Sequence, residues 1–150
     1  MDRNTLAEWM KSESLKVHDL ANQMREHIIT IPTGSRTAWL EELCKRFDHF
    51  TAHVRRMMSI EEEDGYLLPV VEVRPSLSKQ VEMLRREHDE LRELTDDLSK
   101  RVKSLKADHN LLLRDTCTRL QIYMGHVQRH EEHENHMVLY TLTQDIGGKD

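Results

Sequence analysis

Apolar residues recur at steps of three and four residues along most of the chain, and this spacing restricts the fold more than any other feature. One run reads Leu77, Val81, Leu84, His88, Leu91, Thr95, Leu98, Val102, Leu105. Such steps place every position on one face of an α-helix. The alternation of apolar and polar residues that is typical of strands is not found. The sequence therefore predicts an all-α fold.

Helix-breaking residues divide this pattern into four long segments. The sequence Ile31-Pro32-Thr33-Gly34-Ser35 ends the first segment, and Pro69 and Pro75 bracket the end of the second. The third fades around residues 106–110, and Gly147-Gly148 closes the fourth. Each segment turns one apolar face toward a shared core. Four such helices with short connections predict a single domain over residues 1–150, folded as an antiparallel up-down four-helix bundle.

Charge and apolar content exclude two classes of partner. The net charge is −5, whereas nucleic-acid binding requires many Lys and Arg against phosphates. The longest apolar stretch, residues 66–71, is far shorter than the roughly 20 residues that span a bilayer. Cys44 and Cys117 form neither a disulfide framework nor a spaced metal motif. We expect a cytoplasmic protein with free thiols and neither a nucleic-acid nor a membrane partner.

Polar residues interrupt the apolar stripes at three places: at Glu61, at His88, and at the pair His130 and Glu134. An ionised carboxylate in a bundle core is costly unless it is paired, protonated or bound to a cation. Residues four apart on a helix lie about 5–6 Å apart at Cβ, so His130 and Glu134 can share one ion. His18, at the edge of the first stripe, would add a further imidazole. This mixture of nitrogen and oxygen ligands favours iron, manganese or zinc.

A faint internal repeat supports a paired site. His53, Met57 and Glu61 match His126, His130 and Glu134, each in steps of four residues. His18 in the first segment likewise corresponds to His88 in the third. Each half of the chain therefore consists of one helix that contains a His and a following helix that contains a His or Met and, four residues later, a Glu. Two such halves predict a pseudo-twofold pair of metals in the bundle.

The order of these residues resembles the hemerythrin-like, or HHE cation-binding, domain. The resemblance is carried by His18, by Glu61 within residues 61–67, by Glu87-His88, by residues 130–135 and by the tail 145–150. It covers the chain from about residue 15 to the end. It implies a four-helix bundle with a non-haem di-iron centre that binds or senses oxygen, a related small ligand or iron. For this chain, the resemblance implies that Glu61 and Glu134 bridge the metals and that His18, His88 and His130 are terminal ligands.

The sequence departs from the family pattern at Met57, where the family has a histidine four residues before Glu61. A thioether is a soft ligand that suits ferric iron poorly. The number of bound metals, one or two, therefore stays open. His53, His126 and Glu131 are the candidates to complete the site.

Two classes of function follow from these observations. The first is a metal-binding protein whose partners are iron and a small ligand such as oxygen, with zinc or manganese as alternative metals. The second, favoured by Met57, is a four-helix interaction or regulatory module with a degenerate or mononuclear zinc site. The sequence has no separate acid–base pair or substrate motif, so we do not expect an enzyme. Catalysis nevertheless stays open, because an open position on a redox metal is what oxygen chemistry requires.

Overall fold

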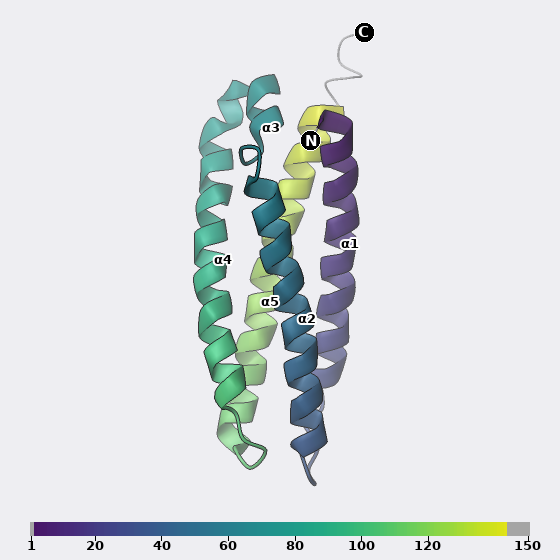
Figure 1. Ribbon diagram of the computed structural model, residues 1–150, viewed down its shortest axis with the longest axis vertical. Helices are drawn as coiled ribbons and strands as arrows, with labels where there is room; N and C mark the ends of the chain where they lie inside the picture. Colours follow the sequence, from purple (N-terminus) through teal and green to yellow (C-terminus); the bar gives the residue numbers. More distant parts are fainter. Residues whose placement is uncertain (1, 144–150) are drawn as a thin grey trace.

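The computed structural model describes residues 2–143 and confirms the all-α prediction. Four long helices run alternately down and up the molecule: α1 (Arg3–Ile28), α2 (Thr37–Glu62), α4 (Ser78–Ser104) and α5 (Asn110–Val138) (Figure 1). A short helix, α3 (Leu68–Val73), and a 3-10 turn, η1 (Pro75–Leu77), connect α2 to α4. A π-helical turn, η2 (Leu139–Thr143), follows α5. The predicted stop at Gly147-Gly148 and the tail 145–150 lie outside the described residues.

The predicted apolar stripes form two cores, one above the other. The larger core fills the lower and middle bundle and includes Phe47, Phe50, Leu98 and Leu120. The smaller core lies near the start of α1 and beneath α3, where it contains Leu6, Met10, Leu67, Val70, Val81, Leu84, Val138 and Leu142. Burying one such side chain contributes about 1.5–3 kcal/mol. These two cores therefore stabilise a bundle that also encloses polar side chains.

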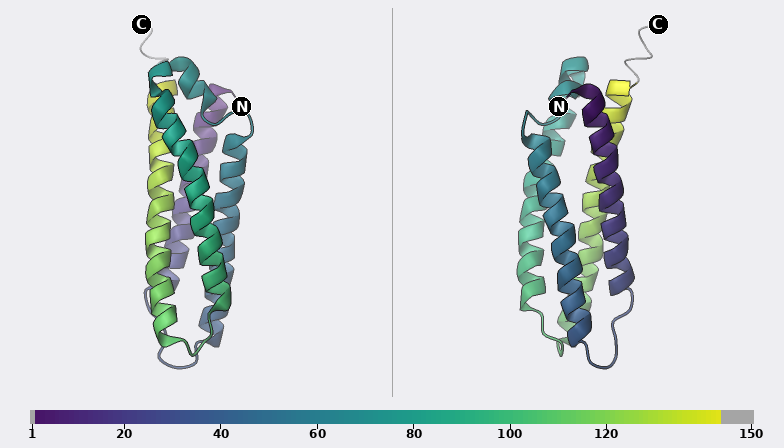
Figure 2. Two further views of the ribbon diagram at one scale, coloured as in Figure 1. Left: turned by 90° about the vertical axis from the view of Figure 1, so that its left-hand side faces the viewer. Right: turned by 45° about the vertical axis from the view of Figure 1, so that its right-hand side comes forward.

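A layer of buried polar residues separates the two cores. It comprises Glu13 of α1, His53 and Glu61 of α2, His88 of α4, and His130, Glu131 and Glu134 of α5. Six of them lie on the inward stripes of their helices between the residues of the larger core and those of the smaller one, whereas His53 lies beside Phe50 and Val54 of the larger core. The four long helices run antiparallel and side by side (Figures 1 and 2). This arrangement brings together residues that are far apart in sequence. We refer to these seven residues as the polar layer.

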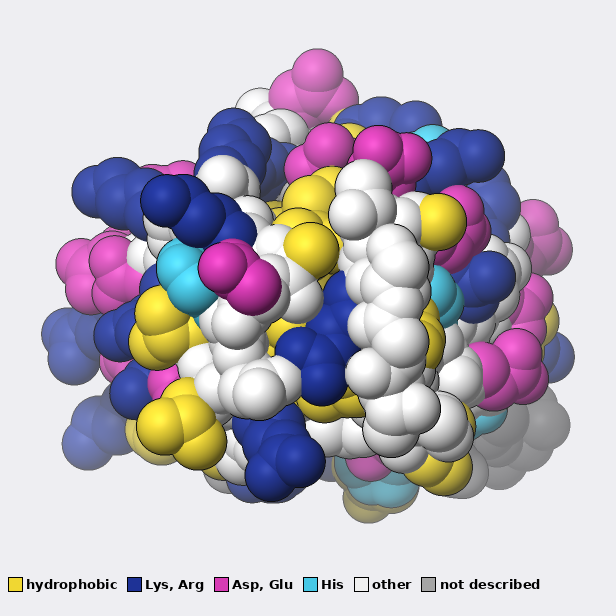
Figure 3. Space-filling view, turned by 90° about the horizontal axis from the view of Figure 1, so that it is seen from below, with side chains coloured by type: hydrophobic (Ala, Val, Ile, Leu, Met, Phe, Trp, Pro, Cys, Tyr) yellow, Lys and Arg dark blue, Asp and Glu magenta, His cyan; other side chains and the backbone are white. Residues whose placement is uncertain are grey.

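The lower end of the bundle holds the α1–α2 and α4–α5 connections. Arg36 links them, because its guanidinium donates to the carbonyl of Pro32 at 2.8 Å and also to the side chain of Asn110. Figure 3 looks at this end and shows Lys and Arg side chains between the loops, with apolar side chains beside them. None of the helices within residues 2–143 combines the length and the apolar character needed to cross a membrane.

The α2–α4 connection differs from the prediction. We expected Pro69 and Pro75 to mark the end of the second helix, but α2 already ends at Glu62. Gly65 has a φ of 92°, in the left-handed region that favours glycine, and turns the chain back toward the bundle. Pro69 lies in the first turn of α3, where its missing N–H leaves no hydrogen bond unmade. This turn carries Tyr66 to the polar layer.

Candidate metal centre

Two overlapping triads in the polar layer have the composition of metal sites. One consists of His88, His130 and Glu134, and the other of Glu61, Glu131 and Glu134. Within each triad one ligand atom from every residue lies within 4.8 Å of the others, and all the residues are buried. Glu134 belongs to both triads. The structure thus brings together four of the five residues predicted as ligands from the sequence, and adds Glu131.

His88 is oriented by carboxylates on both sides of its ring. Its Nδ1 lies 2.7 Å from Glu62, whose carboxylate also accepts from Arg92 at 2.8 Å. Its Nε2 lies 3.3 Å from Glu134 and 3.4 Å from Glu61. Burial alone would lower the pKa of His88, but the contacts with Glu134 and Glu62 raise it. When Nδ1 donates to Glu62, Nε2 is directed at the carboxylates of the layer.

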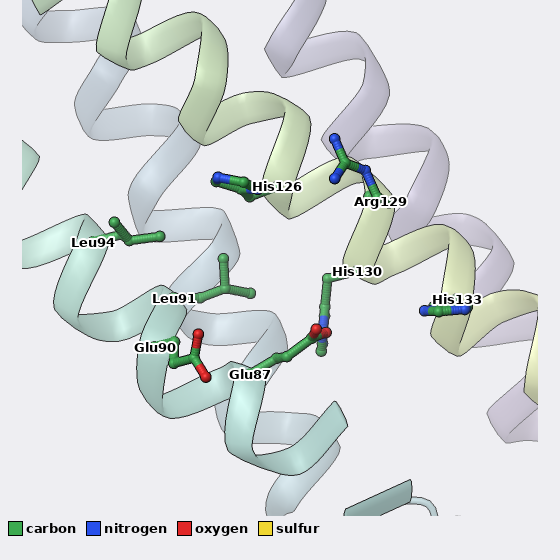
Figure 4. A pocket seen from close by; sticks show the side chains of 8 residues that line it. All are labelled: Glu87, Glu90, Leu91, Leu94, His126, Arg129, His130 and His133. Atoms are coloured by element: carbon green, nitrogen blue, oxygen red, sulfur yellow. The ribbon is translucent and has the colours of Figure 1, made fainter. Parts of the chain in front are cut away.

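His130 repeats this arrangement from α5. Its Nδ1 lies 2.7 Å from Glu87 of α4, and its Nε2 lies 3.3 Å from Glu134. Figure 4 shows Glu87 directed at His130, whereas His126 and His133 project from other turns of α5. The rings of His88 and His130 are 4.9 Å apart between centroids. Both imidazoles therefore hold one nitrogen toward an outer carboxylate and the other toward Glu134.

Five carboxylate oxygens at the centre lack hydrogen-bond donors among the described residues. Within the described part of the chain, both oxygens of Glu61 and of Glu131 and one oxygen of Glu134 have no hydrogen-bond partner. Buried polar atoms are nearly always paired, because leaving one unpaired costs about 1–3 kcal/mol. A cation at this point would bind one oxygen from each of these three carboxylates. The residues present therefore fit a metal.

The pKa values reflect the crowding of these acids. Burial, reinforced by the charge of Glu134, raises the pKa values of Glu61 and Glu131 well above the usual range. Burial acts in the same direction on Glu134, but the contacts from His130 and His88 lower its pKa below the usual range. Without a cation, these surroundings therefore favour the ionised form of Glu134 and the protonated forms of Glu61 and Glu131.

Tyr66 closes the upper side of the centre, a role that the sequence analysis did not anticipate. Its hydroxyl donates to Glu134, and its ring lies 4.6 Å from that of His88 in an edge-on arrangement. Burial, together with the charge of Glu134, raises the pKa of Tyr66 far above its usual value. Tyr66 is therefore a neutral hydrogen-bond donor that fixes one oxygen of Glu134.

His18 is the predicted ligand that the structure does not bring to the centre. Its side chain is exposed, and the Gln128 amide lies 3.1 Å from its Nδ1. The buried face of α1 runs through Met10, Glu13 and Val17, and the next residue is turned about 100° away from this face. The prediction of His18 as a ligand was wrong because it assigned the inward face of α1 to the wrong helical positions. Glu13 is the polar residue of α1 that faces inward, and its position in the stripe was a signal available in the sequence.

The three candidates to replace the missing histidine differ in position. His126 is exposed. His53 is buried but engaged elsewhere, with Nε2 3.0 Å from Glu13 and Nδ1 3.2 Å from Arg56. Met57 packs in the larger core. Glu131 is the candidate that joins a triad.

One comparison with known proteins gives a match. A family model described as the hemerythrin HHE cation binding domain matches residues 5–142. Searches among curated proteins and among solved structures return no match. The family match covers nearly the whole chain, including every residue of both triads, and confirms the resemblance expected from the sequence. The chain belongs to the hemerythrin HHE cation-binding domain family.

Proposed function

We propose that this protein binds iron through His88, His130 and Glu134, and that it binds or senses oxygen, a related small ligand or iron itself. The observation that carries the proposal is the orientation of the two imidazoles. Each has Nδ1 at 2.7 Å from an outer carboxylate and Nε2 directed at Glu134. Histidines that bind metals commonly donate their second nitrogen to a carboxylate in this way, which fixes the tautomer and the ring.

The ligand types support iron. Two imidazoles with carboxylate oxygens suit iron, manganese and zinc, and suit calcium or thiolate-bound metals less well. Glu61 and Glu134 both lie close to His88, and they are the residues that would hold a second metal together with the first, as the family resemblance implies. Bound iron would supply redox chemistry and affinity for small ligands. The chain's own part is to orient the imidazoles, through Glu62 and Glu87, and to fix Glu134 through Tyr66.

A surface pocket provides access from solvent to His130. It has a volume of about 240 Å³ and is lined by Glu87, Glu90, Leu91, Leu94, His126, Arg129, His130 and His133 (Figure 4). Pockets for drug-sized ligands are larger, at roughly 300–1,000 Å³. The size therefore suits a small ligand such as oxygen rather than an organic substrate.

The direct test is to count the metal in protein purified from iron-supplemented cells and to record its visible spectrum in air. We expect bound iron with charge-transfer absorption in the wild type. His130→Ala should lose most of this iron, whereas His133→Ala, an exposed neighbour on the same helix, should keep it. Wild-type protein without metal, or equal iron in both variants, would contradict the proposal.

The second candidate is a mononuclear zinc site in a bundle that acts as an interaction or regulatory module. It is favoured by the position of Met57, which packs in the apolar core, and by the exposure of His18. His88, His130 and Glu134 still supply three ligands, enough for a zinc ion with one open position. One colourless metal per chain would support this candidate. Both cysteines are free thiols, which agrees with the cytoplasmic location we propose for either function.

A further inference from the structure

The polar layer has a nitrogen-bearing half and an all-oxygen half, and the second half carries a separate inference. We propose that Glu61, Glu131 and Glu134 hold a second cation, and that this position prefers a hard divalent ion such as Mn²⁺. The inference rests on the proposed function, in which His88 and His130 hold the first metal. It concerns which residues form the second metal position and which metal that position prefers.

The first support is the burial of unpaired carboxylates. Glu131 is 2% exposed and Glu134 is 0% exposed, and the side chain of Glu61 is 1% exposed. Neither oxygen of Glu61 or of Glu131 has a hydrogen-bond donor among residues 2–143. Three carboxyl groups in contact, away from water, repel one another when ionised. A divalent ion among them would reverse that repulsion.

The second support is geometric. Glu131 and Glu134 lie three residues apart on α5 and project to the same side, and Glu61 meets them from α2. One oxygen from each lies within 4.8 Å of the others. A hard cation binds oxygen at about 2.0–2.6 Å, so two ligand oxygens on one ion are up to about 4–5 Å apart. The triad therefore has the spacing of a single coordination sphere.

The third support is the chemistry of the ligands. This triad contains neither nitrogen nor sulfur, and carboxylate-only sites suit Mg²⁺, Ca²⁺ and Mn²⁺. The residue on α2 one turn before Glu61 is Met57, and the nearest imidazole on that helix, His53, is held by Glu13 and Arg56. Glu131 supplies an oxygen in place of the missing imidazole. The two positions therefore differ in their preference for metals.

The fourth support is an acidic pocket beside Glu61. A pocket of about 210 Å³ borders Glu61 between the C-terminal end of α2, the start of α3 and Leu6 of α1. Its lining includes Glu63, Asp64 and Glu72, and shares no residue with the pocket at His130. Carboxylates around an opening attract cations and raise their local concentration. The oxygen triad thus lies beside an acidic opening that is separate from the pocket at His130.

The test uses the full chain and Mn²⁺ as the probe. Metal-free protein receives one equivalent of Zn²⁺, which fills the nitrogen-bearing position, and Mn²⁺ is then titrated while its electron paramagnetic resonance signal is recorded. We expect one Mn²⁺ to bind per wild-type chain. Glu131→Gln keeps the shape of the side chain without its charge, and should weaken Mn²⁺ binding at least about tenfold while the Zn²⁺ remains bound.

Glu132→Gln is the matched control, because Glu132 is the exposed neighbour of Glu131 and should bind Mn²⁺ as the wild type does. Glu61→Gln provides a second variant should Glu131→Gln fail to fold. Retention of wild-type Mn²⁺ affinity in Glu131→Gln would overturn the inference, as would wild-type protein that binds Zn²⁺ but no Mn²⁺. Failure to bind either ion would overturn the proposed function as well, so the two failures are distinguishable.

Discussion

Replacing Glu131 with Met should change the stability of the protein in opposite directions without and with metal. The wild-type carboxyl is 2% exposed, and neither of its oxygens has a hydrogen-bond partner among the described residues. Met is unbranched and similar in length, and contains no group that needs a hydrogen bond or a cation. The variant therefore removes an electrostatic cost from the metal-free protein and a ligand from the metal-bound one.

The expected magnitude follows from the cost of that carboxyl. A buried polar group without a partner costs about 1–3 kcal/mol, so metal-free Glu131→Met should be more stable than the wild type by about this amount. For a chain of this size, 1 kcal/mol corresponds to roughly 2–4 °C in the unfolding midpoint. A metal at 100 times its Kd stabilises the folded protein by about 2.7 kcal/mol. Metal bound at Glu61, Glu131 and Glu134 should therefore stabilise the wild type by this amount, whereas Glu131→Met should lose this stabilisation.

Thermal unfolding, followed by circular dichroism in a chelator and again with Mn²⁺ and Zn²⁺, measures both differences. The order of the midpoints should reverse between the two conditions. Glu132→Met, at the exposed neighbouring position, should stay within about 0.5 kcal/mol of the wild type in both. A metal-free Glu131→Met less stable than the wild type, or an order unchanged by metal, would refute the reasoning.

Three further predictions concern other parts of the bundle. His18→Ala should retain the metal content of the wild type, because His18 is exposed and contacts Gln128; loss of metal, measured by elemental analysis, would return His18 to the ligand set. Tyr123→Phe should lower the free energy of unfolding by about 0.5–1.5 kcal/mol in a urea titration, because the 2.7 Å hydrogen bond to the buried Thr95 is lost; an unchanged midpoint would contradict this. Burial raises the pKa of the Cys117 thiol from 9.0 to about 11, so its alkylation rate should keep rising with pH across that interval, and a plateau below pH 9 would contradict the burial. Because the folded state disfavours the thiolate, the stability that this neutral thiol contributes is present below pH 9 and is lost as the pH rises toward 11.

The sequence predicted the buried faces of the helices well, because helical periodicity is a local property. On α4 the positions from Val81 to Val102 in the predicted stripe are all buried, including the polar residues His88 and Thr95. The same reasoning placed Glu61, His130 and Glu134 inside the bundle. It failed at α1, whose stripe is less regular, and there a difference in register exchanged His18 for Glu13.

The contacts between helices could not be predicted in the same way. Glu62 lies 26 residues from His88 in sequence, and Glu87 lies 43 residues from His130. Whether such pairs meet depends on how far each helix is rotated about its axis and shifted along it, which the spacing within one helix does not determine. The position of Tyr66 likewise depends on the turn at Gly65, because α2 ends at Glu62 and not near the prolines.

The internal repeat illustrates the same limit. His53 and His126 correspond in sequence, yet His53 is buried against Glu13, whereas His126 is exposed. Met57 and His130 correspond as well, but Met57 packs in the apolar core and His130 lies at the centre. The two halves are therefore related in sequence but differ in chemistry, which is the basis for the two unlike metal positions proposed above.

The central claim is that His88, His130 and Glu134 bind a metal in the core of the bundle. Anomalous X-ray scattering at the iron absorption edge, from crystals of iron-loaded protein, tests it most directly. We predict a peak within bonding distance of Nε2 of His88, Nε2 of His130 and a carboxylate oxygen of Glu134. A core without a peak, or iron confined to exposed histidines such as His133 and His136, would contradict the claim.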